Sequence, residues 1–385
     1  MSQPNLYELA VEERQLKMER RDAEVDYYAT RVSELDLSDI GRFAMYHPDP
    51  SEHMEAGITF AHRDLESVTD AMANGEEWAV VSGLNPSAPL HMGHKLVFDE
   101  LLWCQKQGAD IYIPITNDET FLVGKAESVA AARKIAYDKI IPAIIAMGFD
   151  PEKTHMFVDS DYPDIYNFAI QVAKETSLNR VYGVFGFGKD EEGENAGTLF
   201  YRAGVQLAEI LLPQLAEFGG PKPTLVPVGI DQYPYVHLSR DVARKMDLTP
   251  PAAVFTKFEE GLDGKGKMSA SRKDSALFLD DDPATIKKKI KSAYTGGSVL
   301  ASYQREVGGI PEICPVYQLR SSHFASNEGL YDACSNGEIL CGDCKAAAVE
   351  EVTDLLADHQ EKLANPVDNV DDYLLKTPID SILGR

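Results

Sequence analysis

The pattern of apolar and polar residues changes near residue 76. Residues 1–45 consist mainly of charged residues and helix formers, which predicts surface helices and is interpreted as a solvated appendage. Further on, short apolar stretches alternate with helical patterns; the strand-like stretches are 78–82, 110–117, 155–160 and 224–231. This rhythm predicts an α/β fold, a Rossmann-like doubly wound parallel sheet with ligands at the carboxyl ends of the strands.

The helical patterns divide the chain further. Residues 127–148, in which Pro142 should start or kink a helical segment, and residues 199–218 predict a helical insertion at about 125–220. After about residue 295 the pattern is almost wholly helical, and its clearest element has an apolar stripe of Val349, Val352, Leu355 and Leu356. Since 385 residues exceed one typical core, we expect three parts. They are an N-terminal helical extension (1–75), a Rossmann domain (76–290) with a loop at 263–273, and a C-terminal α-helical domain (291–385).

The net charge of −25, from 62 acidic and 37 basic residues, argues against a nucleic-acid partner in bulk, because Lys and Arg supply most affinity for phosphates. A local basic strip can overrule this. The strip at 287–291, with Arg320 and His323, is the candidate for contacts with RNA phosphates, and a solvated face is its alternative. Such acidity is also typical of a protein in concentrated salt, where screening shrinks self-repulsion; an ordinary acidic cytosolic protein is the other interpretation.

No targeting or membrane segment is predicted. The N-terminus lacks a basic region followed by an apolar one, and even the apolar stretch 199–213 contains Arg202 and Glu209. We expect a soluble, cytoplasmic protein without a membrane partner.

The segment 82–96 carries the first chemical signal. An apolar strand passes through a turn with glycine and proline into a helix start, where unpaired N–H groups and the helix dipole favour an anion. His91 and His94 could reach phosphate oxygens there, and Gly93 would let a nucleotide base approach the backbone. The alternative is a capped turn with two structural histidines.

The second signal is Lys267-Met-Ser-Ala-Ser271, which follows the flexible Asp263-Gly-Lys-Gly266. A mobile loop that delivers a lysine and hydroxyls suits a triphosphate whose charge moves onto pyrophosphate as the bond breaks. A solvated turn is the alternative, but both signals on one α/β pattern favour a site for a nucleoside triphosphate.

These residues resemble a known family. "PSAPLHMGH" and "KMSAS" look like the two signatures of class I aminoacyl-tRNA synthetases, and "VGIDQYPYVHLSRDVARK" (228–245) is similar to a segment of the tryptophanyl-tRNA synthetases. The resemblance runs from about residue 55 to 364, is closest to the archaeal and eukaryotic branch, and includes the segments 57–68, 115–122, 184–190 and 286–297.

The resemblance implies an ATP-dependent ligase that charges tRNA(Trp) with tryptophan through an adenylate and releases AMP and pyrophosphate. The carboxylate of the amino acid attacks the α-phosphate and is already ionised at neutral pH, so no general base is needed. His91 and His94 would contact the phosphates, and Lys267, Ser269 and Ser271 would hold the departing pyrophosphate with help from Mg²⁺. The residues expected to bind ATP are Gly83, Gly93, Gly229, Asp231 and Met268.

The same resemblance implies a homodimer paired through the helical insertion and a C-terminal domain that binds the anticodon. Two other functions stay open at this point. One is a synthetase for another amino acid, tyrosine first, and the other is a synthetase-like paralogue that binds RNA without charging it.

The amino-acid pocket departs from the family pattern. Where relatives read the indole N–H with a tyrosine and a glutamine, this chain has Val81 and Pro114; it also has Leu84-Asn85 in place of Arg-Gly and Tyr233 in place of an aspartate. The matching residues assigned to the ammonium and carboxylate groups are Glu119, Gln206 and Gln232.

Glu209 offers a replacement acceptor for the indole N–H. It follows Gln206 by three residues, on the same face of the predicted helix, where bacterial relatives place a carboxylate. The alternative is a glutamate paired with Arg202 or exposed at the helix edge.

The cysteines fall into two groups. Cys104 is expected in the core. The others follow a C-x19-C-x6-C-x2-C pattern (Cys314, Cys334, Cys341 and Cys344), and cytosolic thiols grouped this way more often bind metal than form disulfides. By count they suit zinc or an iron–sulfur cluster equally. The resemblance favours a [4Fe–4S] cluster, since some tryptophanyl-tRNA synthetases carry one on a similar pattern; unligated core cysteines are the alternative.

Overall fold

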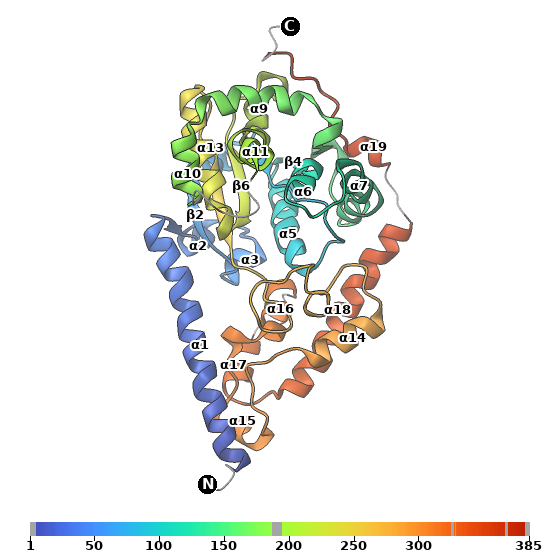
Figure 1. Cartoon of the computed structure of the whole chain (residues 1–385). Coiled ribbons are helices and arrows are strands. Elements are labelled where there is room, and N and C mark those ends of the chain that lie inside the picture. The colour runs from blue at the N-terminus through green and yellow to red at the C-terminus, as the bar shows by residue number, and fades with distance from the viewer. Residues whose placement is uncertain (1–4, 187–194, 325–326, 328, 366–368, 382–385) are drawn as a thin grey trace. The chain divides into compact units, whose positions relative to one another are not determined.

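The structure, a computed structural model, describes residues 5–186, 195–324, 327, 329–365 and 369–381 (Figure 1). Residues 187–190, which belong to the similar segment 184–190, lie outside the described residues. The chain forms two compact units. The first unit comprises residues 1–59, 90–96 and 257–361, and the second comprises 60–89, 97–256 and 362–385. The segments expected as N-terminal extension and C-terminal domain therefore contribute mainly to one unit, which also takes in the histidine turn and the Lys267 loop.

The second unit is built on a parallel sheet. Its strands are β3 (Ala79–Val81), β4 (Asp110–Ile115), β5 (Thr154–Val158), β6 (Thr224–Gly229) and β7 (Ala252–Thr256). They pair in the order β7-β6-β3-β4-β5, and each of these neighbouring pairs is parallel. The chain thus starts in the middle, winds to one edge and returns to the other, which confirms the doubly wound α/β fold. β2 (Thr59–Arg63), a strand that the sequence pattern did not predict, lies next to β7.

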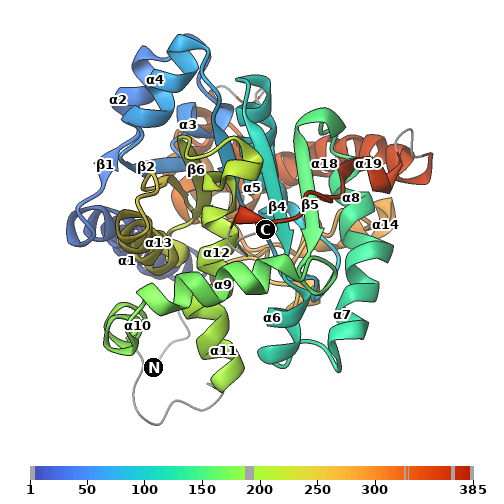
Figure 2. The same cartoon turned by 90° about the horizontal axis from the view of Figure 1, so that it is seen from above.

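Helices surround this sheet. They are α4 (Glu66–Asn74), α5 (Met92–Lys106), α6 (Asn117–Leu122), α7 (Val129–Ile135), α8 (Ile141–Ile145), α9 (Asp164–Glu175), α10 (Leu178–Phe185), α11 (Ala196–Phe200), α12 (Gln206–Leu211), α13 (Tyr233–Lys245) and α19 (Val370–Tyr373). Figure 2 shows β6, β4 and β5 in one sheet, with α9, α12 and α13 gathered on one side. Because parallel strands are covered on both faces, β4 and β7 are almost continuously buried, and Cys104 of α5 is fully buried as predicted.

Two π-helical turns interrupt the predicted long helices. Residues Ala136–Ile140 form one directly before α8, where Pro142 occupies the first turn as expected. Residues Tyr201–Val205 form the other, directly before α12. The stretch 199–218 is therefore a chain of short helical pieces, and its π turn sets the direction of the side chains that follow it.

The first unit is mostly helical, as the pattern of its C-terminal part predicted. Its elements are α1 (Leu6–Glu34), β1 (Ser38–Asp39), α2 (Gly41–Tyr46), α3 (Glu52–Glu55), α14 (Pro283–Ser292), α15 (Ala301–Val307), α16 (Pro315–His323), α17 (Leu330–Ser335) and most of α18 (Cys341–Ala364). On α18 the buried stripe includes Val352 and Leu356, while Val349 and Leu355 are half-buried.

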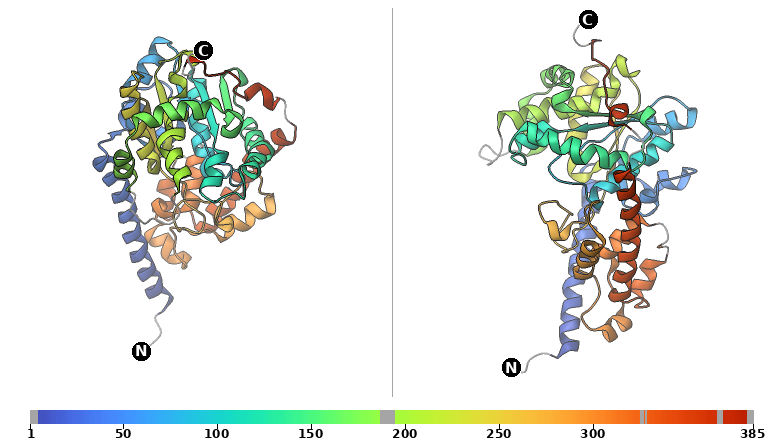
Figure 3. Two further views of the ribbon diagram at one scale, coloured as in Figure 1. Left: turned by 45° about the horizontal axis from the view of Figure 1, so that its top comes forward. Right: turned by 90° about the vertical axis from the view of Figure 1, so that its right-hand side faces the viewer.

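Helix α1 is not the solvated appendage that its charge pattern favoured. In Figures 1 and 3 it runs beside the segment that carries α15. Arg14 donates to the carbonyl of Gly308 at 2.7 Å, and Lys17, which is buried, donates to the carbonyl of Gly297. The charged residues of α1 thus cap carbonyl groups, which a sequence pattern alone cannot distinguish from a solvated face.

Candidate functional site

The histidine turn is held by strand-like hydrogen bonds. His91 pairs with Phe278 in an antiparallel bridge, Met92 N donates to the carbonyl of Leu277, and Leu279 N donates to the carbonyl of Leu90, both at 2.9 Å. The segment 277–279 follows the Lys267 loop in the chain. The fold therefore places the two sequence signals in one compact unit.

His91 and His94 form a stacked pair at the start of α5. Their ring centroids lie 3.9 Å apart, and His94 Nδ1 accepts a hydrogen bond from His91 N at 3.2 Å. His91 is buried, and its Nδ1 has no hydrogen-bond partner among the described residues. Burial, followed by the neighbouring His94, lowers the pKa of His91 to about 2. His91 is therefore neutral at neutral pH and would meet a phosphate as an uncharged imidazole.

Gly93 packs against this pair. A Cβ there would lie 3.1 Å from Cε1 of His91 and 3.3 Å from Cβ of Glu259. A side chain at this position would press on both neighbours, so the packing of the turn itself favours glycine.

The Lys267 loop is a defined turn rather than an irregular one. Glu260 and Lys267 form an antiparallel bridge, and Met268 N donates to the carbonyl of Glu259 at 2.7 Å. Met268 is buried, whereas Lys267 and Ser271 are exposed. The hydroxyls of Ser269 and Ser271 lie 3.0 Å apart, close enough to bind one anion together.

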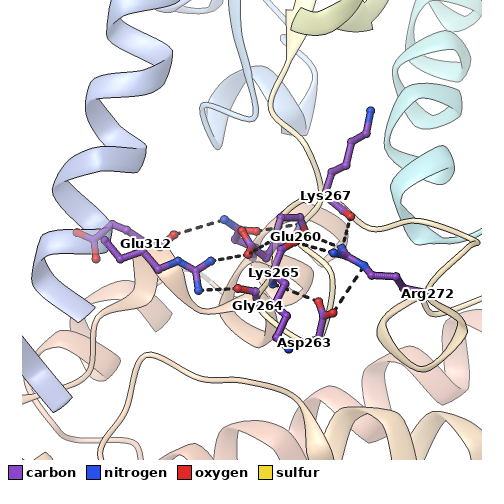
Figure 4. Close-up of polar contacts among 10 residues, drawn as sticks. Glu260, Asp263, Gly264, Lys265, Lys267, Arg272 and Glu312 are labelled. Carbon is purple, nitrogen blue, oxygen red and sulfur yellow. Dashed lines mark hydrogen bonds and ion pairs between the residues drawn. The ribbon is translucent and has the colours of Figure 1, made fainter. Parts of the chain in front are cut away.

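Arg272, which the sequence analysis missed, holds this turn from one side (Figure 4). Its guanidinium donates to the carbonyls of Lys265 at 2.6 Å, Gly266 at 3.2 Å and Lys267 at 2.7 Å, and it lies 3.6 Å from Asp263. The side chain of Lys267 extends away from this network in Figure 4, with Nζ 5.1 Å from the ring centre of Phe258. In the sequence, the position of Arg272 directly after the Lys-Met-Ser-Ala-Ser stretch could have pointed to this role.

In the second unit, the strand ends meet where the sheet reverses direction. β3 leads into Gly83 and β6 leads through Gly229 to Asp231, which is exposed, and these two strands are neighbours. This is the place where doubly wound sheets bind ligands. A Cβ at Gly83 would lie 2.5 Å from the carbonyl oxygen of Pro114, so close packing against β4 requires glycine.

The fold also groups the residues assigned to the amino acid. Gln206 of α12 donates to Gln232 at 3.4 Å. Glu119 of α6 accepts from Asn85 at 3.3 Å and from Thr116 at 3.2 Å, and burial raises its pKa. Asn85, one of the departures from the family pattern, therefore orients Glu119.

Glu209 is buried, with 3% of its surface exposed. Its Oε2 accepts from the hydroxyl of Tyr201 at 3.4 Å, and its Oε1 has no hydrogen-bond partner among the described residues. Arg202 lies over the ring of Phe185, 5.5 Å from its centre. The alternative of an exposed glutamate is therefore wrong, and within the described part of the chain no ion pair with Arg202 is found.

Asp159, which directly follows β5, was not singled out from the sequence. It is fully buried, and neither carboxyl oxygen has a hydrogen-bond partner among the described residues. Burial, then the charges of Glu209 and Asp118, raise the pKa of Asp159 far above its usual range. Burial and the neighbouring acids raise that of Glu209 as well. Around them, Tyr166 donates to Asp118 at 3.0 Å. In the sequence, Asp159 could have been recognised as a candidate because it is an acidic residue directly after an apolar strand.

The predicted cysteine group lines one small cavity in the first unit: Cys314, Cys334, Cys341 and Cys344. Burial raises the pKa of Cys314 to about 11 and that of Cys334 to about 12. Arg320 donates to Sγ of Cys344 at 3.5 Å. Within the described ranges, no three His, Cys, Asp or Glu side chains lie close enough together to hold one metal ion.

The residues predicted to contact RNA phosphates differ in their exposure to solvent. Lys287, Lys288 and Lys291 of α14 are exposed. Arg320 is buried and bonded to Glu351 at 2.7 and 2.8 Å. The side chain of His323 is buried, 3.5 Å from Glu259. Assigning Arg320 and His323 to RNA phosphates was therefore wrong, because both are used inside the protein.

A search of the described helices for one of sufficient length and apolar character to cross a bilayer finds none.

Comparison with known proteins gives a consistent answer. The family described as tRNA synthetases class I (W and Y) matches residues 73–357. The chain is 38% identical over 328 residues to the tryptophan–tRNA ligase of Pyrobaculum calidifontis, covering 84% of this chain and 86% of that protein. It is 40% identical over 315 residues to that of Methanocaldococcus jannaschii, covering 79% and 83%.

Solved structures agree with this. The tryptophanyl-tRNA synthetase of Aeropyrum pernix superimposes with a TM-score of 0.80 at 34% identity, over 89% of this chain and 95% of that one. The enzyme of Plasmodium falciparum gives 0.79 at 28% identity, over 92% and 99%. The chain belongs to the class I tRNA synthetases of the tryptophan and tyrosine group, and within them to the tryptophanyl-tRNA synthetases.

Proposed function

We propose that this chain ligates tryptophan to tRNA(Trp) at the expense of ATP, through a tryptophanyl-adenylate, with release of AMP and pyrophosphate. The observation that carries the choice of amino acid is the buried Oε1 of Glu209, an acceptor without a partner among the described residues. Relatives named tryptophan–tRNA ligase, 38% and 40% identical over most of the chain, support the same choice.

In the first step, the tryptophan carboxylate attacks the α-phosphate and pyrophosphate leaves. Lys267, Ser269 and Ser271 stabilise the charge that grows on the pyrophosphate. The exposure of Lys267 and Ser271 and the 3.0 Å between the two hydroxyls support this role. Mg²⁺ would be bound mainly by the phosphates of ATP and by water, so it needs no dedicated site on the protein.

The histidine turn binds the phosphates by hydrogen bonds rather than by fixed charge. His91 is neutral, since burial and His94 hold its pKa near 2. A neutral imidazole N–H can donate to a phosphate oxygen, and Nδ1 of His91 has no partner among the described residues. Gly83, Gly93, Gly229, Asp231 and Met268 complete the proposed ATP-binding set.

In the second unit, Glu119 receives the tryptophan ammonium group, and Gln206 and Gln232 bind the carboxylate end. The hydrogen bond between the two glutamines fixes their amide groups, and Asn85 and Thr116 fix the carboxylate of Glu119. A buried carboxylate pairs well with a substrate cation, because neither group is left without a partner.

The indole N–H donates to Oε1 of Glu209. Burial and the neighbouring acidic groups raise the pKa of both Asp159 and Glu209, so this pair can retain a proton at neutral pH, and Oε1 of Glu209, which has no partner among the described residues, is the proposed acceptor. A ligand without an N–H at this place would leave a buried acceptor unpaired, which favours tryptophan over phenylalanine by roughly 10⁴ or more.

A phenol O–H could also donate to Glu209, which keeps tyrosine as the second substrate to test. ATP–pyrophosphate exchange with each of the twenty amino acids distinguishes them. We expect stimulation by tryptophan; stimulation by tyrosine without tryptophan would overturn the assignment. Absence of charging of any tRNA by the purified protein would favour an RNA-binding paralogue instead.

A [4Fe–4S] cluster is the proposed occupant of the cysteine cavity, with zinc as the alternative. The cysteines line one space, but no three lie close enough for a single ion. A cluster holds its thiolates around several irons and so spaces them more widely than one zinc does. A Cβ at Gly297 would lie 2.2 Å from Sγ of Cys341, and one at Gly309 would lie 2.7 Å from Sγ of Cys334, so these glycines leave room for the thiols. Anaerobic purification should give iron and absorbance at about 400 nm; zinc without iron would refute the cluster.

The homodimer is proposed to form through the helical insertion. Ile170 of α9, Leu178 and Tyr182 of α10 and Phe200 of α11 are large exposed apolar residues of that segment. Exposed apolar groups gathered on one surface are typical of protein interfaces. Light scattering at several protein concentrations should give twice the chain mass of 42.5 kDa.

Contacts with tRNA are proposed for Lys287, Lys288 and Lys291 and, within residues 291–385, for an anticodon-binding domain. The exposure of these lysines in a chain of net charge −25 supports the assignment, since the rest of the surface repels phosphates. A soluble enzyme of this kind is assigned to the cytoplasm.

A further inference from the structure

Helix α1 reaches the turn that precedes Lys267. Arg20 donates to the carbonyl of Gly264 at 2.7 Å and to Oε1 of Glu260, and its guanidinium lies over the ring of Tyr294, 5.1 Å from the centre. All of these residues belong to the first unit. An N-terminal helix far away in sequence thus contacts the loop assigned to pyrophosphate.

Glu260 connects Arg20 to the backbone of the loop. Its carboxylate is buried, accepts from Arg20 and also accepts from the N–H of Gly266 at 3.2 Å. Its own backbone pairs with Lys267 in the antiparallel bridge. A charge-assisted bond to a buried carboxylate is stronger than an ordinary hydrogen bond, so the position of Arg20 fixes the strand from which Lys267 projects.

Gly264 fixes the other end of the turn. Its φ of +64° lies in the left-handed region, and a Cβ there would lie 2.6 Å from Cδ1 of Tyr294. The backbone of Gly264 therefore packs closely against the same ring that the guanidinium of Arg20 covers. With Arg272 on the carbonyls of residues 265–267, two arginines hold the turn, and only Arg20 comes from outside it.

We propose that Arg20 is a positioning residue for the nucleotide step: it sets the place of Lys267, and helix α1 is therefore part of the ATP-binding machinery. The proposal rests on the role of Lys267 in the proposed function. A displacement of a catalytic group by about 1 Å costs on the order of 10²-fold in rate, so loss of Arg20 should be visible in the kinetics.

The test measures ATP–pyrophosphate exchange for Arg20→Ala and Arg20→Lys. We expect Arg20→Ala to lower kcat/KM for ATP by about tenfold or more while the KM for tryptophan changes by less than about twofold. Arg20→Lys, which keeps a cation for Glu260 but has no second planar donor for Gly264, should fall in between.

Arg14→Ala is the matched control, because Arg14 lies on the same helix and donates to a different glycine carbonyl, that of Gly308. It should remain within about twofold of the wild type. If Arg14→Ala lowers exchange as much as Arg20→Ala does, α1 acts through general stability and the proposal is wrong.

A double-mutant cycle separates this inference from the proposed function. If Arg20 acts through Lys267, Arg20→Ala should add little to the loss in Lys267→Ala. Full additivity of the two losses would overturn the inference. A Lys267→Ala enzyme with normal exchange would instead overturn the role of Lys267. If Arg20→Ala does not fold, the double-mutant cycle of Arg20→Lys with Lys267→Ala takes its place, and the same outcomes support or overturn the inference.

Discussion

The Lys267 loop and the buried acids of the proposed amino-acid pocket differ in how their charges are balanced. In the loop, Arg20 and Arg272 pair with Glu260, Asp263 and backbone carbonyls near the surface. In the pocket, Asp159 and Glu209 are buried without an ion-pair partner among the described residues, and burial raises the pKa of both.

The difference follows from the two tasks. A loop that holds a polyanion needs permanent positive charge and a defined backbone, which ion pairs supply. A pocket that selects an N–H donor needs an acceptor that nothing in the protein satisfies beforehand. In the proposed function, the unpaired Oε1 of Glu209 costs stability in the free protein and is the source of the specificity for tryptophan.

The largest expected effect concerns the Lys267 loop. Lys267→Ala should lower the rate of ATP–pyrophosphate exchange by about 10²–10³-fold, because one preorganised charge at the leaving group is lost. Tryptophan binding, followed by equilibrium dialysis without ATP, should not change. Lys265→Ala, which removes an exposed lysine two positions earlier, is the control.

On the pocket side, Glu209→Gln should lower kcat/KM for tryptophan by about 10- to 100-fold, since an amide NH₂ can take the place of a carboxyl oxygen as the group that faces the indole N–H. The KM for ATP should stay constant. Glu217→Gln changes a half-buried glutamate of the same stretch, 199–218, which accepts from Ser381, and it should leave kcat/KM for tryptophan unchanged. Equal losses in the two variants would contradict the pocket assignment.

Salt should change the stability of the protein through its whole acidic surface rather than through either site. With a net charge of −25, raising KCl from 0.1 to 1 M shortens the screening length from about 10 Å to about 3 Å and should raise the melting temperature by about 2–4 °C. A melting temperature that is constant or falls with KCl would contradict the interpretation of the acidic surface as an adaptation to salt.

The smallest expected effect is the pH dependence of the melting temperature that Asp159 causes. The pKa of Asp159 is raised in the folded state, so the folded protein holds its proton more tightly than the unfolded chain does. Stability is then greatest below about pH 4 with respect to this group and declines as pH rises toward the folded pKa. Asp159→Asn removes the group, and its melting temperature should fall less than that of the wild type between pH 5 and 8, by about 1–3 °C.

Asp161 is the matched control with the opposite sign. Burial raises its pKa somewhat, but hydrogen bonds from Arg133 and Tyr137 outweigh this and lower the pKa below its usual value. Its contribution is present above about pH 4 and is lost as pH falls. Asp161→Asn should therefore change the melting curve only on the acid side. The same pH response in both variants would argue against a proton held by Asp159.

Local patterns in the chain predicted much of the fold. The strands at β3, β4, β5 and β6, the helix start at His91 and the effect of Pro142 all follow from the alternation of apolar stretches and from turn residues. The strand β2 was missed, because its five residues, Thr-Phe-Ala-His-Arg, contain no continuous apolar run of the kind that marks the other strands. The interpretation of α1 as an appendage failed for a related reason, since a helical pattern does not reveal which charged face binds carbonyl groups.

The sequence by itself determined the family, the doubly wound sheet and the residues proposed to bind the nucleotide in the His91 turn and the Lys267 loop, because these depend on residues close together in the chain. Only the tertiary structure decided which charges are used inside the protein. Arg320 and His323 are buried against Glu351 and Glu259, Asp159 lies against Glu209, and Arg20 contacts Glu260 from 240 residues away. Burial and pairing of charges depend on which segments the fold brings together, and no local pattern contains that information.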